Sequence, residues 1–140
     1  MKKDTTRDYA IAAFARYFAM GCPGEGQIEE RTRKRIEREN TEATAEDIAS
    51  LMECELIKLR PTIKDIDAVR EVLSELERGT VPEIAKAVRA VYSRPAKHKN
   101  EIEFRVIAFA IDTPADKRTV YRWLKIARTM FATARGLVVD

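Results

Sequence analysis

The chain has 140 residues, of which 45% are hydrophobic and 35% are charged, and its net charge is +3. This length suffices for one domain, or for one domain with a helical extension. Only 5 Gly and 5 Pro interrupt it, and helix-forming residues are abundant. We therefore expect an all-α protein, a multi-helix bundle. No stretch reaches the roughly 18 apolar residues of a membrane span.

The charge is unevenly distributed along the sequence. Residues 1–85 hold 14 Lys and Arg against 18 Asp and Glu, a sum of −4, whereas residues 86–140 hold 12 against 5, a sum of +7. A basic C-terminal part on a slightly acidic remainder favours an anionic polymer as the partner.

The residue types needed for catalysis or metal binding do not occur in recognisable patterns. Cys22 and Cys54 share no motif and only one histidine is present, so a zinc site of ordinary spacing is not expected. The glycines of residues 21–26 lack the ending of a phosphate loop. We expect a protein that is not an enzyme, binds no cofactor or metal, and is cytoplasmic, with Cys54 buried in a hydrophobic helix.

Two N-terminal helices are predicted, over residues 6–20 and 26–40. The first carries an aromatic face at spacings of three and four, formed by Tyr9, Phe14, Tyr17 and Phe18. This face exceeds what a small monomer covers, and it predicts a homo-oligomer that associates through the N-terminal helices. The second helix contains a basic run, 31–35, but neighbouring glutamates can pair with it, which indicates a solvated face.

Pro61 is expected to separate the next two helices. One begins at a capping box of Thr44 and Asp47 and ends before Pro61, and the other covers residues 62–78. We expect these two helices to pack as an antiparallel or steeply crossed pair. The chain is therefore divided into an N-terminal helical region for interaction or dimerisation, 1–60, and a helical domain that ends in a helix-turn-helix, 61–140.

A further helix begins at residues 80–83 and ends at Arg94 and Pro95. The basic loop that follows, 93–99, contains Lys97 and Lys99, which are candidates for contacts with phosphate groups. The next helix is predicted over residues 101–112.

Residues 100–136 are predicted to form a helix-turn-helix. The second helix begins near Pro114, with Thr113 as its cap, or alternatively behind Asp116. Its apolar stripe consists of Val120, Leu124, Ala127 and Phe131. Cationic and polar side chains suited to a DNA groove occupy the rest of its surface. The candidates for DNA contact on this helix are Lys117, Arg118, Thr119, Tyr121, Arg122, Lys125 and Arg128.

The run Thr119–Leu124 (TVYRWL) resembles the recognition-helix signature of helix-turn-helix regulators. Residues from about 61 to 136 also resemble phage late-gene regulators of the RinA and ArpU type, relatives of the promoter-reading fourth region of sigma factors. The resemblance implies that Val120 and Leu124 are core residues. It also implies contacts with bases or phosphates from Arg118, Thr119, Tyr121 and Arg122. The sequence departs from the pattern in the turn, where Thr113, Pro114 and Ala115 replace the usual Leu, Gly and Val or Ile.

These features predict a sequence-specific DNA-binding transcriptional regulator encoded by a prophage. Double-stranded DNA would be the main partner, with RNA polymerase or a second copy contacted by the N-terminal helices and no membrane involved. Two alternatives remain open. One is a phage assembly protein, such as a small-terminase-like DNA-packaging adaptor, and the other is a module that binds only proteins.

Overall fold

The computed structural model describes residues 4–98 and 100–137 of the chain. Over these residues it contains six α-helices and no β-strand, so the all-α prediction is confirmed. The helices are α1 (Thr5–Ala19), α2 (Gln27–Glu39), α3 (Ala45–Arg78), α4 (Glu83–Tyr92), α5 (Glu101–Ile111) and α6 (Lys117–Arg135). No helix in this part of the chain combines the length and the apolar character of a membrane span.

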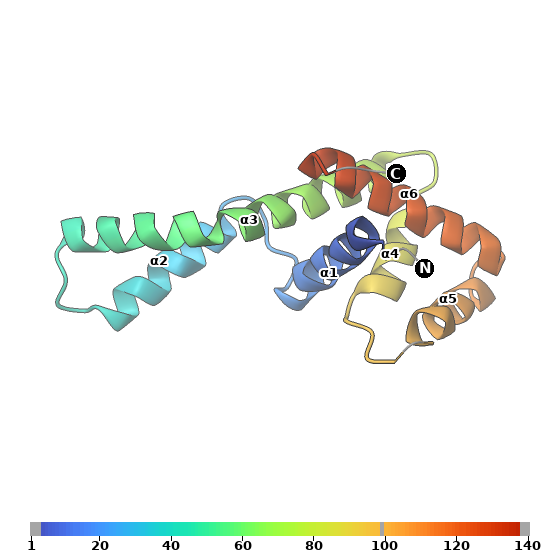
Figure 1. Cartoon of the computed structure of the whole chain (residues 1–140), viewed down its shortest axis with the longest axis horizontal. Helices are drawn as coiled ribbons and strands as arrows, with labels where there is room; N and C mark the ends of the chain where they lie inside the picture. The colour runs from blue at the N-terminus through green and yellow to red at the C-terminus, as the bar shows by residue number, and fades with distance from the viewer. Residues whose placement is uncertain (1–3, 99, 138–140) are drawn as a thin grey trace.

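The molecule consists of a body and a protruding arm (Figure 1). The arm is formed by α2 and residues 45–60 of α3, and α2 packs against no other helix than α3. The body is formed by α1, residues 61–78 of α3, α4, α5 and α6. Because α3 passes from the arm into the body without a break, one helix determines how the two parts are placed.

Pro61 lies inside α3, so the prediction of two separate helices packed against each other is wrong. An interior proline removes the N–H that would bond the carbonyl of Ile57, at a cost of roughly 3 kcal/mol. Both residues are exposed, so water can hydrate the freed carbonyl. The predicted capping box of Thr44 and Asp47 is confirmed and stabilises the helix start. The boundary predicted at residue 60 falls within this continuous helix.

The arm buries little because it contains only two helices. Its buried side chains are Ile28, Thr32, Ile36 and Met52. Leu51 and Ile57 remain 39% and 56% exposed. Cys54 is exposed as well, which corrects the prediction of a buried thiol, because the outer flank of α3 has no neighbouring helix.

The basic run of α2 is neutralised by carboxylates one turn away. The ion pairs are Lys34–Glu30 at 3.3 Å, Arg35–Glu39 at 3.8 Å and Arg33–Glu37 at 4.0 Å. Arg35 also contacts Glu55 on α3 at 3.2 Å, which joins the two helices of the arm. The predicted solvated face is confirmed, and these cations have partners within the chain.

The centre of the body lies where α1, α4 and α6 meet. Phe14 of α1 is fully buried, with its ring centroid 5.9 Å from that of Tyr92 and 5.8 Å from that of Phe131. Tyr17 is 7% exposed. Tyr9 remains 40% exposed, so the chain itself covers much of the aromatic face of the first helix but not all of it, and self-association through the N-terminal helices stays a prediction. The face is covered to this extent because α3, α4 and α6 all pack against α1.

Candidate nucleic-acid interface

The helix α6 begins at Lys117, three residues after Pro114, so the predicted start near Pro114 is wrong. The side chain of Asp116 accepts a hydrogen bond from the backbone N–H of Thr119 at 2.8 Å. That hydrogen bond is the first cause of the lowered pKa of the Asp116 carboxyl. The Thr113 hydroxyl donates to the Phe109 carbonyl of α5 instead. Thr113, the other candidate for the cap, thus belongs to the end of α5, and Asp116 is the residue that caps α6.

One face of α6 is completely buried in the body. Val120, Leu124, Ala127 and Phe131 are each 0% exposed, which confirms the predicted apolar stripe. Trp123 is half-buried at the edge of this stripe. Because these residues span most of the helix, α6 is held against the body and its opposite side is presented to solvent.

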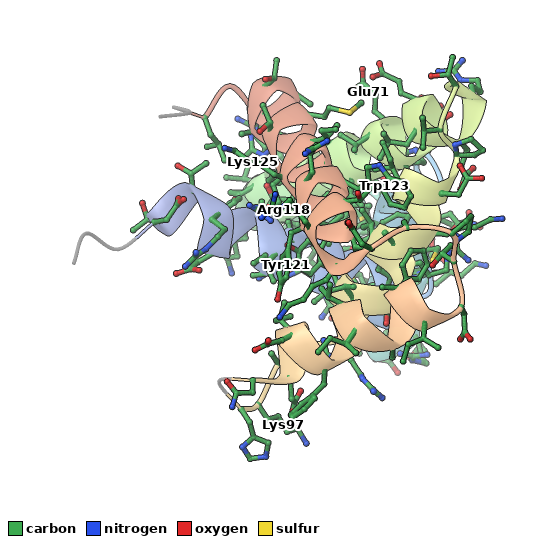
Figure 2. The ribbon with its side chains drawn as sticks, turned by 90° about the vertical axis from the view of Figure 1, so that its right-hand side faces the viewer. Glu71, Lys97, Arg118, Tyr121, Trp123 and Lys125 are labelled. Carbon is green, nitrogen blue, oxygen red and sulfur yellow. The ribbon has the colours of Figure 1, made fainter. Side chains whose placement is uncertain are left out.

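The opposite side of α6 carries a row of exposed side chains, which we call the α6 ridge: Arg118, Tyr121, Arg122 and Lys125. Figure 2 shows Arg118, Tyr121 and Lys125 along one side of α6 and Trp123 on the other. Each of the three cations has no carboxylate within ion-pair distance in the described chain. The ridge is therefore a row of positive charges that have no protein partner there.

Lys117 and Thr119, near the start of α6, have more contacts within the protein than the residues of the ridge. Lys117 forms an ion pair with Glu103 of α5 at 2.5 Å, and this hydrogen bond raises the pKa of the lysine. Thr119 is half-buried, and its backbone makes the capping bond. Lys117 therefore connects α5 to α6, and any contact with an external anion would compete with Glu103.

Arg128, another predicted contact, points away from the ridge. Its Nη1 donates to the hydroxyl of Tyr92 on α4 at 2.8 Å. Burial raises the pKa of Tyr92, and the charge and hydrogen bond of Arg128 partly oppose that effect. Arg128 therefore lies on the side of α6 that faces the body. The spacing along the helix predicted Arg128 near the ridge, but it did not identify Tyr92 as the partner of Arg128.

The predicted loop contacts lie apart from the ridge. Figure 2 shows Lys97 on the loop beyond α5, separated by that helix from the labelled residues of α6. The Lys97 side chain is exposed. Lys99 lies outside the described residues. The structure thus brings together four of the nine predicted residues as the ridge, and it places Lys97 at a different edge.

Arg105 holds this loop in place, although no sequence pattern singled it out. Its guanidinium donates to the carbonyls of Val91 and Arg94 at 2.8 Å and of Pro95 at 3.1 Å. It also pairs with Glu101 at 2.8 Å. The backbone of Lys97 is the first cause of the lowered pKa of Glu101, and the charge of Arg105 adds to it. The charged start of α5 thus determines the path of the loop before it.

No family model, curated protein or solved structure matches the chain.

Proposed function

We propose that this protein is a sequence-specific DNA-binding transcriptional regulator of prophage origin that lays the N-terminal half of α6 in the major groove. One observation supports this above the others: Tyr121 and three cations with no ion pair among the described residues are exposed together on one side of a helix whose other side is fully buried. A recognition helix requires an apolar face that packs against the body and an opposite polar face that is exposed to DNA.

The chemistry of the ridge suits both parts of DNA recognition. An arginine can donate two hydrogen bonds to the O6 and N7 atoms of guanine, whereas a lysine contacts phosphate as a compact charge. We assign Arg118 and Arg122, near the start of α6, to base edges, and Lys125 to the DNA backbone. In this arrangement α5 crosses the backbone beside the groove, as the first helix of a helix-turn-helix does.

Binding to a duplex from upstream of the protein's own coding region tests the proposal. The affinity should fall steeply with salt, while the preference over an unrelated duplex persists. Arg122→Ala should weaken specific binding by about 1–3 kcal/mol and relax the preference at one position. Lys125→Ala should lower the salt slope by about one with no change in preference.

A matched control is available on the arm. Arg38 is an exposed helical arginine with no ion pair among the described residues, so Arg38→Ala should leave both affinity and preference unchanged. If no duplex is bound even at low salt, or if Arg38→Ala and Arg122→Ala weaken binding equally, the proposal is wrong.

A second candidate is an assembly or protein-interaction role, including that of a DNA-packaging adaptor. It is supported by an apolar stripe on α5, where Phe104, Ile107 and Ile111 are 67%, 38% and 78% exposed at spacings of three and four. Self-association through the arm fits the same role, because Leu51 and Ile57 are exposed there. In the regulator, these surfaces would contact a second copy or RNA polymerase.

A further inference from the structure

A groove lies between α1 and a wall formed by the end of α4, the loop after it, α5 and α6, and it adjoins the α6 ridge at Tyr121. Its volume is about 760 Å³, within the range that small-molecule sites occupy. Its walls are largely apolar and include Ile11, Ala15, Ala19, Pro95 and Ile102. Residues 7–19 of α1 run along it, so it extends for roughly 18 Å. An apolar body of substantial length can therefore lie against α1.

One end of the groove gathers cations around a buried hydroxyl. Arg128 donates to the hydroxyl of Tyr92, which is 1% exposed. Arg7 and Tyr121 are close enough to affect the pKa of that hydroxyl. The Arg128 guanidinium has five N–H donors, and one hydrogen bond, to a neutral phenol, is its only contact of this kind in the described chain. It forms no ion pair there. A half-buried guanidinium in this state is suited to bind an anion.

The charges along the groove also favour an anionic ligand. Arg7, Arg16 and Arg128 line it together with a single carboxylate, Asp8. The Arg7–Asp8 pair is 3.5 Å apart and about half exposed, so solvent screens it. Arg16 follows Arg7 by nine residues, about 13.5 Å along α1. The groove thus has an excess of positive charge, with two arginines and the one carboxylate at the end near Arg128 and with Arg16 further along α1.

We propose that this groove binds a small amphipathic anion. The carboxylate head would lie between Arg128 and Arg7, and the apolar body would extend along α1 towards Ala19. A DNA phosphate would account for the arginines but not for the apolar walls. An acidic helical peptide would need a wider binding surface than the alanine-lined wall of this groove provides. Binding of such a peptide is one outcome of the test below.

Occupancy of the groove would also regulate the α6 ridge, a consequence that rests on the proposed function. Tyr121 belongs to the ridge and lines the groove. A head group beside Arg128 would contact Tyr121 and place a negative charge near the path of the DNA backbone. The ligand should therefore lower the affinity for DNA.

Decanoate is a suitable probe, and its binding to the full chain can be followed by titration with NMR detection. We expect saturable binding, with shifts at Ile11 and Tyr92. The cationic analogue decyltrimethylammonium should not bind. Arg128→Gln, which keeps a donor for Tyr92, and Arg7→Gln should each weaken decanoate binding by about tenfold or more, the loss expected for a charge-assisted hydrogen bond.

Arg38→Gln and Arg122→Ala are the matched controls, since neither residue lines the groove, and both should bind decanoate as the unmodified protein does. The proposal is overturned if decanoate does not bind, if the cation binds equally well, if Arg128→Gln and Arg7→Gln bind unchanged, or if only an acidic helical peptide occupies the groove.

DNA competition separates this inference from the proposed function. Decanoate should displace the upstream duplex from the unmodified protein but not from Arg7→Gln. If decanoate binds and the duplex is never bound, the proposed function fails while the groove site stands. If both bind without competition, the regulatory consequence is wrong.

Discussion

Asp65 is a buried carboxylate, 3% exposed, that joins three helices of the body. It accepts hydrogen bonds from the Tyr9 hydroxyl at 2.8 and 2.9 Å and from Nε of Arg135 at 2.6 Å. Asp65→Ala would leave the Arg135 guanidinium, whose side chain is 18% exposed, without its carboxylate. We expect a loss of about 3 kcal/mol in the free energy of unfolding, measured in urea.

The matched control for Asp65 lies two residues further along α3. Asp67 pairs with Arg70 at 2.9 Å, but its side chain is 53% exposed, so Asp67→Ala should cost less than about 1 kcal/mol. Equal losses for the two variants would contradict the stabilising role assigned to the Asp65 cluster.

Asp116 contributes stability that depends on pH. Its pKa is lowered from the ordinary value of 3.8 by the Thr119 N–H. The folded state therefore gains from the charged form above pH 3.8, and the gain is lost as the pH falls through the lowered pKa. Asp116→Ala should lower the urea midpoint at pH 7, and the difference from the unmodified protein should shrink in acid. A difference that does not change with pH would exclude the capping charge as the cause.

Individual neighbours were the least predictable part of the candidate site. The arginine at position 128 has the spacing of a DNA contact, yet it donates to Tyr92, which lies 36 positions earlier in the sequence. Likewise, Arg105 reaches carbonyls 10 to 14 positions away. Sequence spacing determines which face of a helix a side chain occupies, but it does not determine which distant backbone approaches that face.

At the scale of the element, periodicity predicted α6 because burial follows the helical repeat. All four residues of its stripe are fully buried. The helix ends were harder to predict, since the start near Thr113 and the start at Asp116 both satisfy local rules. In the structure the Thr113 hydroxyl donates to the Phe109 carbonyl, four residues earlier at the end of α5, and the Asp116 carboxylate caps α6.

The proline of α3 provides a test at the same scale. Pro61→Ala would restore a donor for the Ile57 carbonyl, while the unfolded chain would gain freedom. We expect a net stabilisation of about 1–2 kcal/mol, with slower amide exchange in residues 57–61. Lys64→Ala, an exposed change on the same helix, should stay within about 0.5 kcal/mol. A destabilised Pro61→Ala would mean that the proline stabilises a bend that the arm requires.

At the scale of the whole molecule, the arm should govern self-association. Leu51→Glu and Ile57→Glu would place charges on its exposed apolar positions. We expect these changes to convert an associated form to a monomer in light scattering after size-exclusion chromatography. Val81→Glu, at a position 37% exposed in the turn between α3 and α4, should leave the mass unchanged. A monomeric unmodified protein would contradict association through the arm.

The uninterrupted course of α3 has a geometric consequence for DNA. A helix of 34 residues is about 50 Å long. If two copies pair side by side through antiparallel arms, their bodies lie at opposite ends of that pair. The two α6 helices would then be separated by more than the roughly 34–36 Å that joins half-sites one duplex turn apart. The operator of such a dimer would consist of widely spaced half-sites, and α3 would set the distance between them.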